Sequence, residues 1–92
     1  MASPAQTWHI YLLCCADGTL YCGVTTDLAR RLAEHQAGTA SKYTRARLPV
    51  AMLAHAPCAD KSAALRLELA VKAKAKGAKL AFLLGQPGAE RA

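Results

Sequence analysis

The sequence has 92 residues, of which 53% are hydrophobic, and it carries a formal net charge of +6 at pH 7. This length allows one domain with a small hydrophobic core, and this apolar content excludes an intrinsically disordered chain. The positive charge favours a polyanionic partner, with nucleic acid first, although such a charge also serves simply to keep a small domain in solution.

The two ends of the chain predict little structure. Residues 1–7 (MASPAQT) are expected to form a short, loose leader. They lack the basic and apolar segments of a signal peptide, so no signal peptide is expected. The domain is expected to span residues 8–85 and to be followed by a frayed tail at residues 86–92. No segment approaches the length of a membrane span, so no membrane partner is expected.

Four cysteines occur without any CxxC spacing: Cys14, Cys15, Cys22 and Cys58. The neighbours Cys14 and Cys15 would point to opposite faces of a strand, which disfavours a shared metal site or disulfide. We interpret all four as reduced thiols, which predicts a cytoplasmic protein.

A β-hairpin is predicted near the N-terminus. The segments Trp8 to Cys15 and Leu20 to Val24 are rich in aromatic and aliphatic residues, and Asp17-Gly18 between them is a strong turn signal. A two-residue loop would put Tyr11 and Tyr21 on opposite faces of the sheet, because side chains alternate along a strand.

A three-residue loop has the opposite consequence for the two tyrosines. With Ala16, Asp17 and Gly18 in the loop, and Gly18 as a bulge residue, Tyr11 pairs with Gly23 and both tyrosines share one face. We predict this three-residue loop.

A helix follows the hairpin. Asp27 is a good N-cap for a helix that begins at Leu28, and Gly38 is a good stop signal. Arg31 and His35 are four residues apart, so they lie together beside the apolar stripe of this helix.

Residues 38–48 (GTASKYTRARL) predict a polar, basic loop. Hydroxyl, cationic and aromatic side chains suit contact with nucleic-acid phosphates, and the loop supplies Lys42, Tyr43, Thr44, Arg45 and Arg47. The alternative is a solvated connection in which Tyr43 only packs. Loops on a rigid scaffold often carry function, and this loop directly follows the helix with Arg31 and His35, so we favour substrate contact.

The second half of the chain predicts a strand at residues 49–56, broken at 57–59, and then a helix from Lys61 to Lys76 capped by Asp60. A short final helix is expected at residues 80–84. This order of elements favours an α/β (α+β) domain, with a small three-stranded antiparallel sheet flanked by helices.

Glu68 is the only acid in the predicted long helix, and a carboxylate among apolar residues needs a partner. The residues alone favour an ion pair with Arg66, Lys72 or another base. At helical pitch Lys72, Lys76 and Lys79 form one stripe, which either contacts a nucleic-acid backbone or is an exposed helix face.

The tripeptides His9-Ile10-Tyr11 and Tyr21-Cys22-Gly23, followed by a helix with Arg31 and His35, resemble the GIY-YIG nuclease family. The resemblance continues through SKYTRARLPV and ALRLELAVK, and is strongest to a small single-domain bacterial (UPF0213-like) subfamily. It implies a three-stranded sheet with helices packed around it. It also implies a divalent-metal-dependent endonuclease that hydrolyses phosphodiester bonds in DNA, with DNA repair as its setting.

The resemblance also implies a role for each candidate residue. Tyr11 would activate water and Tyr21 would position it, with these two roles exchangeable. Arg31 would clamp the phosphate, and His35 would orient it or move a proton. Glu68 would hold Mg²⁺ or Mn²⁺, expected only together with substrate. On the grounds of charge, we also count Lys72 of the lysine stripe among the nucleic-acid contacts.

Two other functions stay open. The chain is alternatively a nucleic-acid-binding module with weak or no turnover that needs a protein partner. The third hypothesis is a thiol-based redox or metal protein built on Cys14, Cys15 and Cys22.

Overall fold

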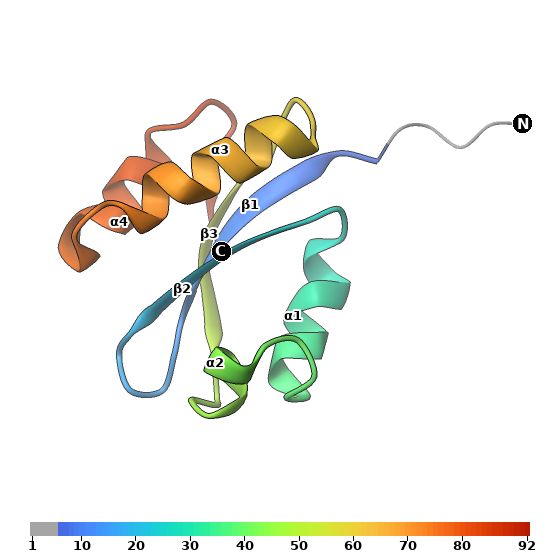
Figure 1. The fold of residues 1–92 in the computed structure, drawn as a ribbon, viewed down its shortest axis with the longest axis vertical. Helices are drawn as coiled ribbons and strands as arrows, with labels where there is room; N and C mark the ends of the chain where they lie inside the picture. The colour runs from blue at the N-terminus through green and yellow to red at the C-terminus, as the bar shows by residue number, and fades with distance from the viewer. Residues whose placement is uncertain (1–5) are drawn as a thin grey trace, which may run out of the picture.

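A computed structural model describes residues 6–92, so most of the expected leader lies outside the described residues. Four strands and four helices follow one another: β1 (Trp8–Cys14), β2 (Leu20–Thr25), α1 (Leu28–Gln36), α2 (Lys42–Arg45), β3 (Ala51–Cys58), α3 (Lys61–Lys72), α4 (Lys76–Leu84) and β4 (Glu90–Arg91). Helices α3 and α4 lie on one side of the sheet, and α1 lies on the other (Figure 1). No helix of the described residues has both the length and the apolar character needed to cross a bilayer.

The antiparallel sheet has four strands in the order β2-β1-β3-β4. The predicted number of three strands is therefore wrong. The extra strand comes from the predicted frayed tail. Glu90 pairs with His55 and Arg91 with Ala54, and the Ala92 amide donates to the Leu53 carbonyl at 3.0 Å. The tail is ordered because the free edge of β3 offers backbone groups that it can pair with.

Strand β3 also runs further than expected, through Pro57 to Cys58. Pro57 pairs with His9 of β1, whereas β4 reaches only His55 and Ala54. A proline is tolerated here because no neighbouring strand requires an amide proton on that side.

The helices depart from expectation at two places. The predicted basic loop contains α2, whose N-cap Ser41 accepts a hydrogen bond from the Thr44 amide. The predicted long helix ends at Lys72, and α4 begins at Lys76. The Lys79 ammonium donates to the carbonyls of Val71 and Lys72, which satisfies the C-terminal end of α3 and explains the break there.

The hairpin has the predicted three-residue loop. Tyr11 pairs with Gly23, and Leu13 pairs with Tyr21. The Cys15 amide donates to the Thr19 carbonyl at 2.8 Å, and Gly18 has a φ of 83°. This positive φ is the conformation that a bulge residue in such a loop adopts, and it fixes both tyrosines on one face of the sheet.

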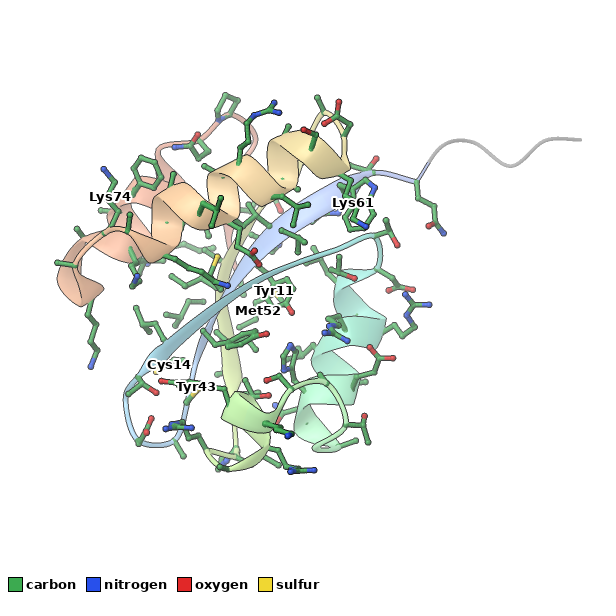
Figure 2. The ribbon with its side chains drawn as sticks, viewed as in Figure 1. Tyr11, Cys14, Tyr43, Met52, Lys61 and Lys74 are labelled. Carbon is green, nitrogen blue, oxygen red and sulfur yellow. The ribbon has the colours of Figure 1, made fainter. Side chains whose placement is uncertain are left out.

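Each face of the sheet has its own small core. Ile10, Leu12 and Cys22 pack toward α3 and α4, whereas Tyr11 and Leu13 pack toward α1. Figure 2 shows Tyr11 and Met52 within the region between the sheet and α1. The alternation of side chains in β1 therefore separates the face that packs against α3 and α4 from the face that carries the candidate tyrosines.

The close approach at Gly23 generates a first prediction. A Cβ added at Gly23 would overlap the Tyr11 hydroxyl. Gly23→Ala is therefore expected to lower the free energy of unfolding by about 1–3 kcal/mol, the usual cost of overpacking. Urea denaturation of the variant and the original chain measures this difference.

Gly77→Ala is the matched control, because a Cβ at Gly77 meets no atom within 4 Å. This change near the start of α4 is expected to be neutral or to stabilise by up to about 1 kcal/mol. Equal effects of the two substitutions would contradict the close fit between Gly23 and Tyr11.

Candidate active site

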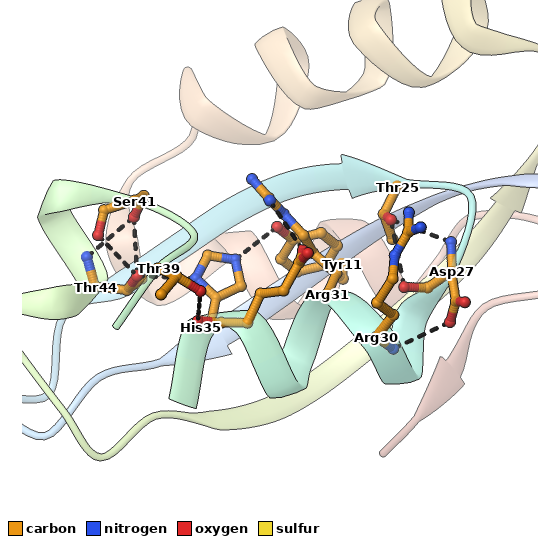
Figure 3. A network of polar contacts seen from close by, with 10 residues as sticks. Tyr11, Thr25, Asp27, Arg30, Arg31, His35, Thr39, Ser41 and Thr44 are labelled. Carbon is orange, nitrogen blue, oxygen red and sulfur yellow. Dashed lines mark hydrogen bonds and ion pairs between the residues drawn. The ribbon is translucent and has the colours of Figure 1, made fainter. Parts of the chain in front are cut away.

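The centre of the candidate site is a hydrogen bond between Tyr11 of β1 and His35 of α1. The Tyr11 hydroxyl lies 2.8 Å from His35 Nε2, and the two residues are 1% and 0% exposed (Figure 3). Helix α1 begins at the predicted cap, since the Asp27 carboxylate accepts from the Arg30 amide. That start point places His35 in the last turn, above the tyrosine face of the sheet.

Burial sets the protonation of this pair. Burial raises the pKa of Tyr11 to about 12, although the nearby Arg31 guanidinium favours the phenolate. Burial, helped by the charge of Arg31, lowers the pKa of His35. At neutral pH Tyr11 is therefore a phenol and His35 a neutral imidazole, so the phenol can donate its proton to an imidazole nitrogen.

Arg31 is held beside this pair by a weak ion pair. Its Nη1 donates to Glu34 Oε1 at 3.2 Å, and the two side chains are 33% and 40% exposed. A surface pair of this kind contributes little to stability. The guanidinium is thus available to release Glu34 and bind a phosphate group instead. It can donate two parallel hydrogen bonds to two phosphate oxygens.

Tyr21 meets the same imidazole through its ring. The Tyr21 and His35 ring centroids are 5.2 Å apart, and Tyr21 also stacks on Tyr43 at 5.9 Å. The Arg47 guanidinium covers the Tyr43 ring at 3.8 Å and binds Asp17 of the hairpin loop. The structure therefore connects two predicted loop residues, Tyr43 and Arg47, with the catalytic candidates.

Thr44 behaves differently from the other predicted loop residues. It is 0% exposed, and its Oγ1 lies 2.8 Å from His35 Nδ1. The expected contact between Thr44 and phosphate is wrong for this arrangement, because the hydroxyl is buried against the imidazole. Lys42 and Arg45, on the same short helix, are exposed.

Glu68 is not part of the tyrosine cluster. It lies on α3, which packs on the opposite face of the sheet, and its charge acts on the buried Cys22 thiol. Its side chain is 17% exposed and lies 3.7 Å from the Lys72 ammonium. The ion pair expected from the residues alone is thus present, and edge strand β2 separates Glu68 from Tyr11.

A pocket of about 200 Å³ lies across this edge strand. It is lined by Leu20, Tyr21, Cys22, Tyr43, Lys72 and Lys79. Tyr21 and Tyr43 belong to the tyrosine face, whereas Lys72 and Lys79 come from the face covered by α3 and α4. The pocket therefore joins the two halves of the candidate site.

The donor groups can hold a divalent ion only in a limited way. Among the described residues no group of three His, Cys, Asp or Glu side chains lies close enough to bind a metal ion. Glu68 supplies one carboxylate next to the pocket that Lys72 lines, whereas the Glu34 carboxylate is paired with Arg31. One carboxylate suits Mg²⁺ that keeps waters and shares substrate oxygens, so the residues fit an ion bound together with substrate.

The four cysteines are free thiols. Burial raises the pKa of Cys22 to about 12 and also raises the pKa values of Cys15 and Cys58. Thiols with raised pKa values react poorly, which argues against the thiol-based redox hypothesis for Cys15 and Cys22.

The sequence analysis did not predict the supporting roles that the structure gives to Ser41, Thr44 and Lys79. The spacing of Ser41 before a short basic segment was a capping signal for α2. The contact between Thr44 and His35 joins two helices, and no local pattern predicts it.

The sequence model described as the GIY-YIG catalytic domain matches residues 7–80. The chain belongs to the GIY-YIG family. The match contains all five candidate residues of the site: Tyr11, Tyr21, Arg31, His35 and Glu68.

Similar proteins place this GIY-YIG chain in the UPF0213 group. It is 48% identical to a UPF0213 protein of Cupriavidus pinatubonensis over 87% of this chain and 89% of the relative. It is 49% identical to one of Xanthomonas axonopodis pv. citri, over 89% and 80% of the two chains. The solution NMR structure of a UPF0213 protein of Bacillus halodurans is 38% identical, with a TM-score of 0.52 and 88% of each chain covered.

The buried phenol of this GIY-YIG domain generates a second prediction. The pKa of Tyr11 is about 12 in the folded protein, above its ordinary value of 10.0. The folded protein favours the neutral phenol, so the Tyr11 hydroxyl contributes fully to the free energy of unfolding below about pH 10. This contribution is lost as the pH rises through about 12. The loss is expected to be about 3 kcal/mol.

Denaturation of the original chain and of Tyr11→Phe, repeated across this pH range, measures the loss. The stability difference between the two proteins is expected to shrink as the pH rises. A difference that stays constant would show that Tyr11 ionises like an exposed phenol.

Proposed function

We propose that this GIY-YIG domain is a divalent-metal-dependent endonuclease that hydrolyses phosphodiester bonds in DNA. The observation that carries the proposal is the contact of Tyr11 with a neutral His35 beside the Arg31 guanidinium. These residues supply a proton acceptor and a fixed positive charge. A hydrolase acting on a phosphodiester needs both groups.

The Tyr11–His35 pair supplies the proton transfer. A phenol with a pKa of about 12 is a poor base by itself at neutral pH. As Tyr11 takes a proton from water, it gives its own proton to His35 Nε2, so water becomes hydroxide and the imidazole becomes cationic. The net result is that His35 acts as the base through Tyr11.

The two tyrosines differ in how accessible they are to a substrate. Tyr11 is 1% exposed, so substrate binding has to uncover its hydroxyl, whereas Tyr21 lines the pocket. Tyr11 has the direct hydrogen bond to an imidazole and is assigned as the residue that activates water. Tyr21 is assigned to position the substrate, and a larger loss in Tyr21→Phe than in Tyr11→Phe would exchange these roles.

Arg31 stabilises the charge that builds on the phosphoryl oxygens. Its planar guanidinium replaces the Glu34 contact with two hydrogen bonds to the phosphate. Glu68, on the other side of the β2 edge, would hold the divalent ion. When bound, such an ion neutralises charge on the phosphate.

DNA is the proposed substrate because the chain has a net charge of +6 and exposed cations at Lys42, Arg45 and Lys72. Exposed lysines and arginines supply phosphate contacts without sequence preference. The free thiols support a cytoplasmic location, and DNA repair is the proposed setting.

A second function, DNA binding with weak or no turnover, is favoured by one observation. Glu68 and Tyr11 lie on opposite faces of the sheet, so this chain alone does not bring the metal ligand and the base together. A protein partner or the substrate itself would have to close this gap. Salt-dependent binding without cleavage in Mg²⁺ or Mn²⁺ is the expected result for this function.

Cleavage of labelled DNA tests the first function. Branched, nicked and single-stranded DNA are incubated with the chain and Mg²⁺ or Mn²⁺, and the products are separated on a gel. Arg31→Ala is expected to lower the rate about 10²- to 10³-fold, because it removes a charge that stabilises the transition state. Glu68→Gln is expected to abolish the dependence of the rate on metal concentration.

Arg30→Ala is the matched control. Arg30 is the neighbouring residue on α1, is exposed, and carries the same charge as Arg31. Loss of the Arg30 charge is expected to weaken non-specific DNA binding as much as loss of the Arg31 charge does. The cleavage rate of Arg30→Ala is nevertheless expected to change by less than about threefold. Cleavage that survives both Arg31→Ala and Glu68→Gln would reject the proposed site.

A further inference from the structure

A chain of buried polar contacts leads from the candidate base to the segment expected to contact DNA. Tyr11 Oη lies 2.8 Å from His35 Nε2, and His35 Nδ1 lies 2.8 Å from Thr44 Oγ1. Thr44 Oγ1 lies 2.8 Å from Ser41 Oγ and 3.4 Å from the Ser41 carbonyl oxygen. Tyr11, His35 and Thr44 are 0–1% exposed, so water does not reach this chain freely.

The protons in this chain can be placed by counting donors and acceptors. A neutral imidazole has one N–H donor and one acceptor nitrogen. If Nδ1 carries the proton, it donates to Thr44, Thr44 donates to an oxygen of Ser41, and Tyr11 donates to Nε2. Every buried hydrogen then has an acceptor within the chain.

The opposite arrangement leaves a buried donor without a partner. If Nε2 carries the proton, it donates to the Tyr11 oxygen, and Thr44 donates to Nδ1. The Tyr11 hydrogen then has no acceptor among the hydrogen bonds of the described residues, while the cationic Arg31 lies beside the same oxygen. A buried unpaired donor is costly, so the geometry favours the first arrangement.

We propose that Thr44 is a positioning residue that acts through His35. Its hydroxyl accepts the Nδ1 proton of His35, which completes the arrangement in which every buried donor is paired, and Nε2 is therefore free to accept the proton of Tyr11. This inference rests on the proposed nuclease function for its effect on rate, but the position of the proton is a property of the free protein.

The proposal gives α2 a second purpose. This helix has only four residues, and its N-cap Ser41 and its buried Thr44 are both members of the chain of contacts. Lys42 and Arg45 of the same helix are exposed to a DNA backbone. The segment expected to bind DNA thus also fixes the proton that makes the imidazole competent.

The charged and titratable groups around His35 come from three elements. Tyr11 of β1 and Tyr21 of β2 face it, and Arg31 and Glu34 of α1 act on it by charge. Thr44, on α2, is neutral. Replacing Thr44 therefore changes a hydrogen bond of the imidazole while leaving the charges around it in place.

Imidazole ¹⁵N NMR of the free protein at neutral pH tests the position of the proton. In the original chain Nδ1 of His35 is expected to resonate as a protonated nitrogen and Nε2 as an acceptor nitrogen. In Thr44→Val, which keeps the shape and removes the hydroxyl, either tautomer leaves one buried donor unpaired, so the fraction of His35 with its proton on Nε2 is expected to rise. Thr44→Ser, which keeps the hydroxyl, is expected to retain the original pattern.

Cleavage kinetics test the consequence of the tautomer. Thr44→Val is expected to lower kcat about 10- to 100-fold, the range seen when outer partners of functional histidines are removed. KM is expected to change by less than about threefold, because no contact with DNA is lost. Thr44→Ser is expected to restore most of kcat.

Thr39→Val is the matched control, because the exposed Thr39 hydroxyl donates to the Glu34 carbonyl and does not touch His35. It is expected to leave both kcat and the ¹⁵N pattern unchanged. A proton on Nε2 in the original chain overturns the proposal, and so does an unchanged ratio of the two tautomers in a folded Thr44→Val variant. If Thr44→Val does not fold, the ¹⁵N pattern of the original chain and the kcat of Thr44→Ser still decide it.

The experiments distinguish failure of the proposed nuclease function from failure of the proposed role of Thr44. If no DNA is cleaved under any condition, the proposed function fails. The NMR result, obtained without DNA or metal, then still decides whether Thr44 sets the His35 tautomer.

Discussion

The close fit between Tyr11 and Gly23 places the rest of the site. The tyrosine ring occupies the space that a side chain at Gly23 would need, and this is possible only because the two residues face each other in the β1–β2 register. The fit directs the hydroxyl toward His35, whose position depends in turn on the Asp27 cap of α1. One strand register and one helix start therefore fix the central hydrogen bond.

The elements that were predictable from the sequence depend on local chemistry. Gly18 set the loop length and thereby the strand register, and Asp27 and Asp60 marked helix starts. The elements that were mispredicted depend on partners elsewhere in the chain. Strand β4 exists because the edge of β3 is free, and α3 ends where Lys79 of the next helix reaches its last carbonyls.

In the candidate site too, some residues were predictable from local patterns and others depend on tertiary packing. Tyr11 and Tyr21 share a face because of strand alternation, and Arg31 and His35 share a side of α1 because they are one turn apart, so these four were predicted together. Glu68 was assigned by resemblance, and its side of the sheet depends on how α3 packs. The role of Thr44 depends on the docking of α2 against α1, which no spacing in the sequence encodes.

Edge strand β2 explains how one small domain can present groups from both faces to one substrate. Tyr21 and Cys22 are neighbours in β2, so they point to opposite faces, yet both line the same pocket. This is possible only at an edge, because a strand with neighbours on both sides would close the path between the faces. A phosphodiester in the pocket would lie between Tyr21 and Lys72, and hence between the proton-transferring face and the carboxylate face. Under the proposed function, the substrate would therefore join the two halves of the site.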